Sequence, residues 1–376
     1  MPEVHHVYLI PGFFGFANLG ELVYFAHVRE FLAKLWGERG VEARVWVVKT
    51  HPTASIRRRA ERLLEAMAET AGQDDSPIHL VGHSSGGLDA RLFATPDVSL
   101  HSELRAEDYA RRLRSVVTLC SPHHGTPVAN FFTSVLGQHL LRLLSLSTIY
   151  ALRFGTLPMS AVSKLVGIFA RLDDQVGLSA TPADQLYDQL LGDFNTDRRE
   201  ALAHLFDEVS WDRALIPQLT VEGVDLFNAG TRDRPGVRYG SVVTWAPSPG
   251  VGTAFKAGFD PYAQATHALY VALWQLASRM PVEHTPTLSG AQVEALWRAF
   301  GEIPGAKAND GVVPTLSQVW GDVIVGARAD HLDVVGHFSD RKHAPPHIDW
   351  LSTGAGFSRT DFESLWTAVA SYLLAD

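Results

Sequence analysis

The sequence predicts an α/β fold, with a mostly parallel central sheet, helices on both faces of the sheet and a helical cap inserted at one edge. Three observations support this prediction. Short apolar runs typical of buried strands alternate along the chain with longer segments of helical periodicity. One of these runs leads directly into Gly82-His83-Ser84-Ser85-Gly86, which is followed by a helical segment. The stretch 131–171 contains no acidic residue and so differs from the rest of the chain.

The bulk composition is that of a folded globular protein, because 46% of the 376 residues are hydrophobic and 19% are charged. The length suits one large domain with insertions, and no repeat or low-complexity linker divides it. We therefore expect a single domain, 1–376, which carries a helical cap or lid at 131–220 and a second helical insertion at 246–307.

The net charge and the N-terminal sequence limit the possible partners and the possible cellular compartment. The formal net charge of -9 gives no indication of a nucleic-acid partner. No uncharged apolar run approaches the length of about eighteen residues that a transmembrane helix requires. The first residues contain neither a basic segment nor an apolar signal segment, so we expect a cytoplasmic protein or one exported without a cleaved signal peptide. Cys120 is the single cysteine, which excludes an intramolecular disulfide, and it follows an apolar run that predicts a core position.

The first part of the chain alternates between strands and helices. Four buried strands are predicted at 7–10, 41–49, 77–81 and 116–120, with helices at 22–36 and 54–71. Right-handed crossovers between parallel strands bring all of their carboxyl ends to one edge of the sheet. The Gly-rich turn Pro11–Phe16, Ser84 and the dipeptide Ser121-Pro122 each follow one of these strands, so we expect them at the same edge.

The second part of the chain begins with the acid-free stretch 131–171. Two interpretations of it remain open: a buried helical layer, or a cap whose apolar face closes over a fatty substrate. Its insertion directly after the fourth strand places it at the edge where Ser84 is expected. Beyond it we expect strands at 237–245 and 322–325, helices at 180–205, 264–279 and 289–300, and a terminal helix that opens with the capping box Thr360-Asp361-Phe362-Glu363 and ends at Leu374.

The segment around Ser84 has the pattern G-x-S-x-G between a strand and a helix. In an α/β-hydrolase this arrangement forms the nucleophile elbow, a tight turn that holds a Ser in a strained conformation with its hydroxyl over the sheet edge. The pattern alone is common, and an ordinary helix N-cap Ser is the alternative. The position between a buried strand and a helix favours the nucleophile.

A nucleophilic Ser needs a base, and the base needs an acid that orients it. In this fold the partners follow in the order Ser, acid, His. Asp310 lies late in the chain within a turn sequence, and His331 is the first His after the last predicted strand. The alternatives from the sequence alone are an ordinary loop Asp at 310, the rival acids Asp330 and Asp333, and the rival bases His337, His343 and His347.

Four segments carry a wider likeness: Ile10-Pro11-Gly12-Phe13-Phe14-Gly15, Gly82-His83-Ser84-Ser85-Gly86-Gly87, Asn309-Asp310-Gly311-Val312-Val313 and His331-Leu332-Asp333-Val334-Val335. Together they resemble the bacterial true lipases of lipase family I. The resemblance is spread over most of the chain, although the insertions 131–171 and 246–307 are not clearly matched. It implies a triad of Ser84, Asp310 and His331.

The oxyanion hole needs two backbone N–H groups aimed at the developing negative charge. One donor is expected from Ser85, which follows the nucleophile, and the resemblance implies that Phe13 supplies the other. The family usually has His-Gly where this chain has Pro11-Gly12. The change leaves a backbone donor in place but removes a side chain that could brace the loop.

The resemblance also implies a structural calcium ion near the catalytic His. Asp333 matches one ligand position, but His337 stands where the family has an amide side chain, and imidazole is a poor ligand for Ca²⁺. No cofactor is required for the chemistry itself.

The expected function is that of a serine hydrolase that cleaves carboxylic esters through an acyl-enzyme, a lipase or esterase acting on acylglycerols or other lipid esters. An acyltransferase or phospholipase using the same site is the alternative, and a non-enzymatic binding protein is a third hypothesis. The substrate is expected to be a lipid or small ester, with transient contact at a lipid interface. We expect Phe14, Phe16 and His83 to line the substrate pocket together with Phe13.

Overall fold

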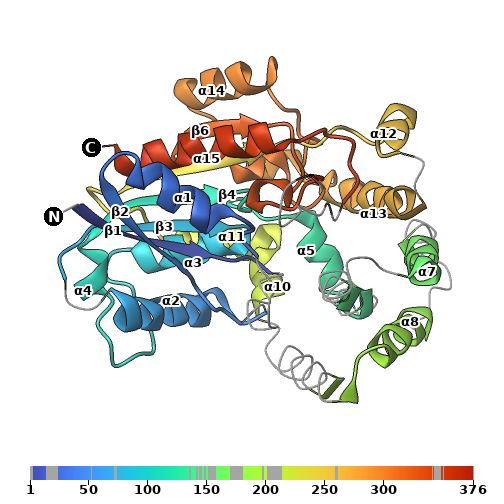
Figure 1. The fold of residues 1–376 in the computed structure, drawn as a ribbon, viewed down its shortest axis with the longest axis horizontal. Helices are drawn as coiled ribbons and strands as arrows, with labels where there is room; N and C mark the ends of the chain where they lie inside the picture. The colour runs from blue at the N-terminus through green and yellow to red at the C-terminus, as the bar shows by residue number, and fades with distance from the viewer. Residues whose placement is uncertain are drawn as a thin grey trace.

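The structure is a computed structural model. Figure 1 shows the arrangement of its helices and strands. It describes residues 3–13, 24–51, 53–71, 74–134, 137–140, 143, 146–147, 150, 158–169, 181–196, 199–200, 214–258, 261–340, 342, 349 and 351–375. Phe14 and Phe16, which were expected in the pocket, lie outside the described residues, as do the rival bases His343 and His347.

A parallel sheet of six strands forms the centre of the molecule, in the order β2-β1-β3-β4-β5-β6. The strands are β1 Glu3–Ile10, β2 Val41–Val47, β3 Ile78–His83, β4 Leu113–Leu119, β5 Arg238–Thr244 and β6 Asp322–Ala327. All six pair in parallel, so their carboxyl ends meet at one edge. This confirms the predicted alternation of strands and crossovers, with strand ends shifted by up to four residues.

Helices cover both faces of the sheet (Figure 1). The described helices are α1 Val28–Gly37, α2 Ile56–Thr70, α3 Ser85–Ala94, α4 Glu107–Ala110, α5 Pro127–Phe132, α7 Met159–Phe169, α8 Thr181–Gly192, α10 Leu215–Leu219, α11 Val221–Gly230, α12 Val251–Lys256, α13 Pro261–Ala277, α14 Gly290–Phe300 and α15 Arg359–Leu374, with short 3₁₀ turns at Val282–His284, Thr315–Gln318 and Asp333–Val335. Helices α1 and α15 pack on one face, and α2 and α3 pack on the other.

The strand β1 shows why the central strands are continuously apolar. Val7 and Leu9 pack into the core under α1 and α15, whereas Tyr8 and Ile10 pack into the core under α2 and α3. Side chains alternate between the faces of a strand, so a strand covered on both sides must be apolar at every position.

The acid-free stretch lies beside the carboxyl edge of the sheet and has a core of its own (Figure 1). Its described buried side chains cluster with those of α8 and α13, and no described residue of the stretch belongs to the two clusters that cover the sheet. Leu140, Leu146 and Leu165 are examples, each almost completely buried. The described side chains of this stretch therefore pack among helices and away from the two faces of the sheet.

Several helix starts differ from the prediction by one to six residues, and two of the differences have a clear physical reason. Helix α1 begins at Val28 rather than at 22, because His27 adopts a left-handed conformation (φ 62°) that cannot continue a helix backwards. The capping box of α15 was placed two residues too late. Ser358 is the N-cap, its Oγ accepts the N–H of Asp361, and the Asp361 carboxylate accepts the N–H of Ser358. Thr360 therefore lies within the first helical turn.

Within the described part of the chain, no helix combines the length and apolarity needed to cross a membrane.

Candidate active site

Ser84 occupies the sharp turn between β3 and α3. Its backbone angles, φ 55° and ψ -129°, are strained for a residue with a side chain. The turn is possible because both flanking glycines are in contact with backbone. A Cβ on Gly82 would lie 2.3 Å from the carbonyl oxygen of Gly86, and a Cβ on Gly86 would lie 2.3 Å from that of Ile10. The sequence G-x-S-x-G therefore folds here as the tight, strained elbow between a strand and a helix that the pattern predicts.

Asp310 is fully buried and its carboxylate accepts five hydrogen bonds. One oxygen accepts the N–H groups of Val312 and Val313, a pattern that follows from the tight turn at Gly311 (φ 96°). The other oxygen accepts from the Thr244 hydroxyl at 3.0 Å, from the Gln318 amide at 3.1 Å and from His331 Nδ1 at 2.8 Å. These donors hold the carboxylate in one orientation.

His331 follows β6 and is nearly buried. Its backbone N–H donates to the carbonyl of Asp310, and its ring Nδ1 meets the Asp310 carboxylate. A carboxylate can only accept, so Nδ1 carries the hydrogen and the neutral ring leaves Nε2 free of a proton. This is the tautomer that a general base requires.

The rival groups have other partners. Asp330 accepts the N–H groups of Leu332 and Asp333, and Asp333 accepts the N–H of Asp330. His337 donates from Nε2 to the carbonyl of Tyr24. Among the described candidates, Asp310 and His331 are thus the acid and the imidazole that meet.

The loop after β1 carries Phe13, the expected oxyanion donor, and Ser85 is the first residue of α3, where N–H groups have no partner within the helix. A side chain of α2 stabilises the loop after β1. Arg59 donates to the carbonyl of Pro11 at 2.6 Å and forms a buried ion pair with Asp89 of α3. These contacts could not be predicted from the sequence, because residues separated by 30 to 48 positions leave no local pattern.

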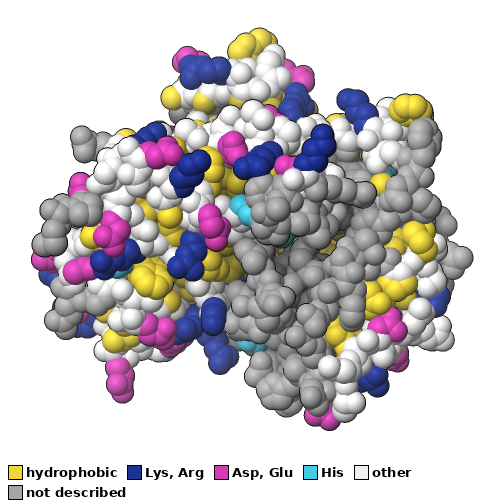
Figure 2. Space-filling model, viewed as in Figure 1, with side chains coloured by type: hydrophobic (Ala, Val, Ile, Leu, Met, Phe, Trp, Pro, Cys, Tyr) yellow, Lys and Arg dark blue, Asp and Glu magenta, His cyan; other side chains and the backbone are white. Residues whose placement is uncertain are grey.

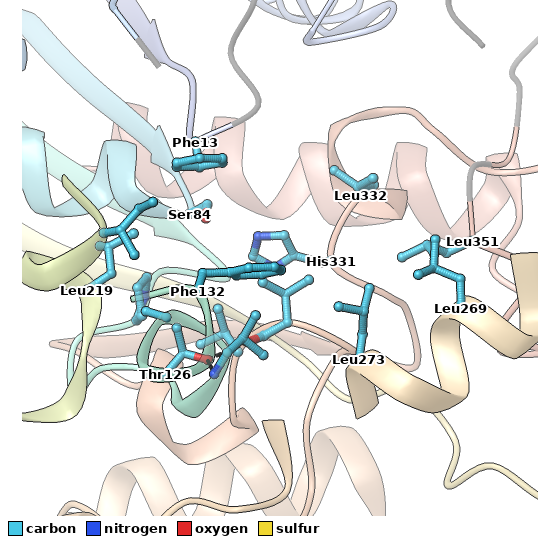
Figure 3. Close-up of a pocket in the computed structure, with 16 residues that line it drawn as sticks. Phe13, Ser84, Thr126, Phe132, Leu219, Leu269, Leu273, His331, Leu332 and Leu351 are labelled. Carbon is cyan, nitrogen blue, oxygen red and sulfur yellow. Dashed lines mark hydrogen bonds between the residues drawn. The ribbon is translucent and has the colours of Figure 1, made fainter. Parts of the chain in front are cut away.

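An apolar cavity of about 140 Å³ opens beside Ser84 and His331 (Figure 3). The described residues that line it are Phe13, Ser84, Pro122, Thr126, Val128, Ala129, Phe132, Ile216, Leu219, Leu269, Leu273, Val312, Val313, His331, Leu332 and Leu351. Phe132 from α5 and Leu269 and Leu273 from α13 come from helices that also pack in the buried cluster of the acid-free stretch. Most of these positions were not identified from the sequence, because the fold brings the lining together from eight separate segments.

His83 does not line the cavity and is fully buried beneath the elbow, which corrects the expectation from the sequence. Burial lowers the pKa of its imidazole well below the usual value. The nitrogens of His83, His331 and the thiol of Cys120 lie close together, but both imidazoles have hydrogen-bond partners and the thiol contacts the Thr244 hydroxyl. Cys120 is buried, as predicted.

Three carboxyl groups gather near the His331 loop. Burial raises the pKa of Asp330 and of Asp333 well above the usual value, and the repulsion of neighbouring carboxylates adds to it. Burial also raises the pKa of Asp349 to about 7. Oxygen ligands and uncompensated negative charge are what a hard cation such as Ca²⁺ requires. Among the described residues, however, Asp330, Asp333 and Asp349 do not form a set whose oxygens lie close enough together to share one metal ion. Asp330 and Asp333 accept backbone N–H groups, and His337 is turned away to Tyr24.

Comparison with known proteins gives no match to a family model and none to a curated protein sequence. The fold, however, is similar to solved bacterial structures. The Staphylococcus hyicus lipase is 17% identical with a TM-score of 0.53, covering 98% of this chain and 95% of that one. EstA from Clostridium botulinum is 18% identical with a TM-score of 0.53, covering 98% of this chain and 87% of the other. A metagenomic carboxyl esterase is 16% identical with a TM-score of 0.51, covering 99% of this chain and 76% of the other.

These similarities, together with the parallel sheet and its covering helices, confirm that the chain has the α/β-hydrolase fold.

Proposed function

We propose that this protein is a serine ester hydrolase of the lipase or esterase type. The observation that carries the proposal is the 2.8 Å hydrogen bond between Asp310 and His331 at a cavity that Ser84 and His331 both line. The likeness in fold to lipases and carboxyl esterases is in keeping with it. The finer resemblance to lipase family I belongs to the same proposal.

In the proposed mechanism, His331 Nε2 takes the proton of the Ser84 hydroxyl as the oxygen attacks the ester carbonyl. Asp310 keeps the proton on Nδ1 and stabilises the imidazolium. The N–H groups of Phe13 and Ser85 hold the oxyanion, and the loss of one such donor in a serine hydrolase costs about 10²–10³ in kcat. His331 then protonates the leaving alcohol, and water releases the acyl group by the same steps in reverse order.

The lining of the cavity supports an apolar acyl group as the part of the substrate that binds there. Apart from Ser84, Thr126 and His331, the described lining residues are hydrophobic, and they include no Lys or Arg. We therefore place neutral lipid esters, such as acylglycerols, before a phospholipid, whose charged headgroup lacks a partner in this lining. Product analysis with added alcohol distinguishes hydrolysis from acyl transfer.

A calcium ion at Asp333, which the resemblance to lipase family I implies, stays a separate prediction, because the described carboxyl groups do not form a ready-made set of ligands. Its role would be to neutralise buried carboxylates and to fix the loop that carries His331. The chemical steps themselves do not pass through it.

The first prediction tests the nucleophile directly. Ser84→Ala should give a folded protein that no longer hydrolyses p-nitrophenyl butyrate, because the attacking oxygen is gone while the residual polar site remains. Circular dichroism checks the fold, and Ser102→Ala, at a half-buried bend far from the cavity lining, serves as the control for handling and purity. Wild-type turnover by Ser84→Ala would refute the proposed mechanism.

A further inference from the structure

A chain of three hydrogen bonds links the loop after β1, which carries Gly12 and Phe13, to the loop that carries His331. The N–H of Gly12 meets the Tyr24 hydroxyl at 3.0 Å. The same hydroxyl meets Nδ1 of His83 at 2.6 Å. The other ring nitrogen of His83, Nε2, meets the carbonyl oxygen of His331 at 2.7 Å. His83 thus lies between Tyr24 and the backbone of His331.

The groups at the two ends fix the direction of every bond. The carbonyl of His331 can only accept, so His83 Nε2 carries a hydrogen and donates. In a neutral ring Nδ1 must then accept, and the Tyr24 hydroxyl donates to it. The Tyr24 oxygen in turn accepts from Gly12. Burial and the neighbouring His331 lower the pKa of His83, and burial raises the pKa of Tyr24, so both groups stay neutral.

Packing leaves the chain of bonds little freedom. A Cβ on Gly12 would lie 2.5 Å from Cβ of Ser84 and 3.0 Å from the Tyr24 oxygen. The loop after β1 is therefore in close contact with both residues. The rings of His83 and His331 are also in contact, with centroids 4.7 Å apart. A change in the position of the Tyr24 hydroxyl would therefore displace the loop that carries Phe13 and, through His83, the imidazole of His331.

We propose that Tyr24 and His83 are positioning residues that hold the oxyanion donor and the base in register with Ser84. This inference rests on the proposed function of Ser84, Asp310 and His331. Neither positioning residue lines the cavity. Each acts through a backbone group: Tyr24 through Gly12 N–H, and His83 through the carbonyl of His331.

The first test compares two tyrosines whose hydroxyl groups form hydrogen bonds inside the protein. Tyr24→Phe removes the hydroxyl between Gly12 and His83, and Tyr8→Phe removes a hydroxyl that bonds to Thr70 at 2.8 Å on the far side of the sheet. We expect Tyr24→Phe to lower kcat for p-nitrophenyl butyrate by about 10-fold to 100-fold, because small misplacement of catalytic groups costs about that much. KM should stay within about twofold, since substrate binding is not altered. Tyr8→Phe should keep the kcat of the wild type.

The second test separates the two ends of the chain at His83. Asn at 83 has a polar atom near the position of Nδ1, and Gln has an amide near the position of Nε2. We expect His83→Asn to keep the Tyr24 bond and His83→Gln to keep the bond to His331. Adding Tyr24→Phe should then reduce kcat further in His83→Asn but hardly at all in His83→Gln, which is the coupling expected of shared contacts.

The outcomes separate the two proposals. If Ser84→Ala retains turnover, the proposed function fails. If Ser84→Ala is inactive and Tyr24→Phe has the kcat of the wild type, or loses no more activity than Tyr8→Phe, the positioning role is overturned and the function stands. Thermal unfolding of all variants shows whether they fold. Additive effects of Tyr24→Phe in both His83 backgrounds would likewise contradict the linked chain.

Discussion

At the scale of single residues, the site depends on polar groups whose hydrogen bonds are completed inside the protein. The carboxylate of Asp310 illustrates this, because it accepts five hydrogen bonds, all from groups of the protein. Two donors are backbone N–H groups of its own loop, and the others are the side chains of Thr244, Gln318 and His331. A buried carboxylate is costly unless it is hydrogen-bonded. The same donors that compensate its burial also aim it at the imidazole.

Asp333 carries the prediction for calcium. If the ion binds there, calcium should raise the unfolding temperature of the wild type and a chelator should lower it, because a ligand that binds the folded state stabilises it. Asp333→Asn should lose this response, and differential scanning fluorimetry measures it. Asp322→Asn, on the exposed start of β6, is the matched control and should respond as the wild type does. An unchanged midpoint for the wild type with and without calcium would exclude the ion.

At the scale of elements, the carboxyl edge of the sheet and the neighbouring helices build the cavity together. The turn at Ser84, the loop after β1 and the loops that carry Asp310 and His331 supply the polar groups. Helices α5 and α13 supply apolar side chains. Figure 3 shows Ser84, Phe132 and His331 around the centre of the site, with Leu269 and Leu273 to the right. Helices α5 and α13 contribute side chains both to the buried cluster of the acid-free stretch and to the lining of the cavity.

This arrangement predicts a dependence on acyl length. Each methylene buried against the apolar lining is worth about 0.8 kcal/mol, which corresponds to about fourfold in kcat/KM. We expect kcat/KM to rise from acetyl to hexanoyl p-nitrophenyl esters. Phe132→Ala should reduce the hexanoyl rate more than the acetyl rate. Phe131→Ala, on the same helix but outside the cavity lining, should leave the ratio unchanged. A wild-type preference for acetyl would contradict a lipid ester as substrate.

At the scale of the whole molecule, charge is spread rather than concentrated on the face shown in Figure 2, where basic and acidic side chains are interspersed. A few large apolar side chains are exposed, among them Val251 and Phe255 on α12 and Trp297 on α14. Such scattered side chains are ordinary on a protein surface. The interior, by contrast, holds several histidines.

The buried His79 predicts a pH-dependent contribution to stability. It lies in β3, bonded to His5 and Ser115, and burial lowers its pKa to about 3. In the unfolded chain the pKa is about 6.5, so the contribution is complete above that pH and is lost as the pH falls towards the folded value. The free energy of unfolding of the wild type should therefore fall relative to that of His79→Gln by up to about 1.4 kcal/mol per pH unit below pH 6.5.

Urea unfolding between pH 7.5 and pH 4.5 measures this difference. The exposed His101 provides the control, and the difference between the wild type and His101→Gln should not vary in the same way. A constant difference between the wild type and His79→Gln across this range would show that His79 does not titrate as proposed.

The sequence by itself determined the elements and the order of the chemical groups. The apolar composition of the central strands β1, β3, β4 and β5 follows from burial on both faces. The pattern G-x-S-x-G between a strand and a helix admits few conformations. These are local properties of the chain. The resemblance to known lipases then directed attention to Asp310 and His331.

Only the tertiary structure decided which distant groups meet. It showed that Asp310, and not Asp330 or Asp333, faces His331, and it moved His83 from the expected pocket wall to a buried position. It also revealed the braces at Pro11 and Gly12 from Arg59 and Tyr24, where a His side chain is absent. Such contacts depend on how crossovers and helices pack, and packing between segments far apart in sequence leaves no periodic signal within either segment.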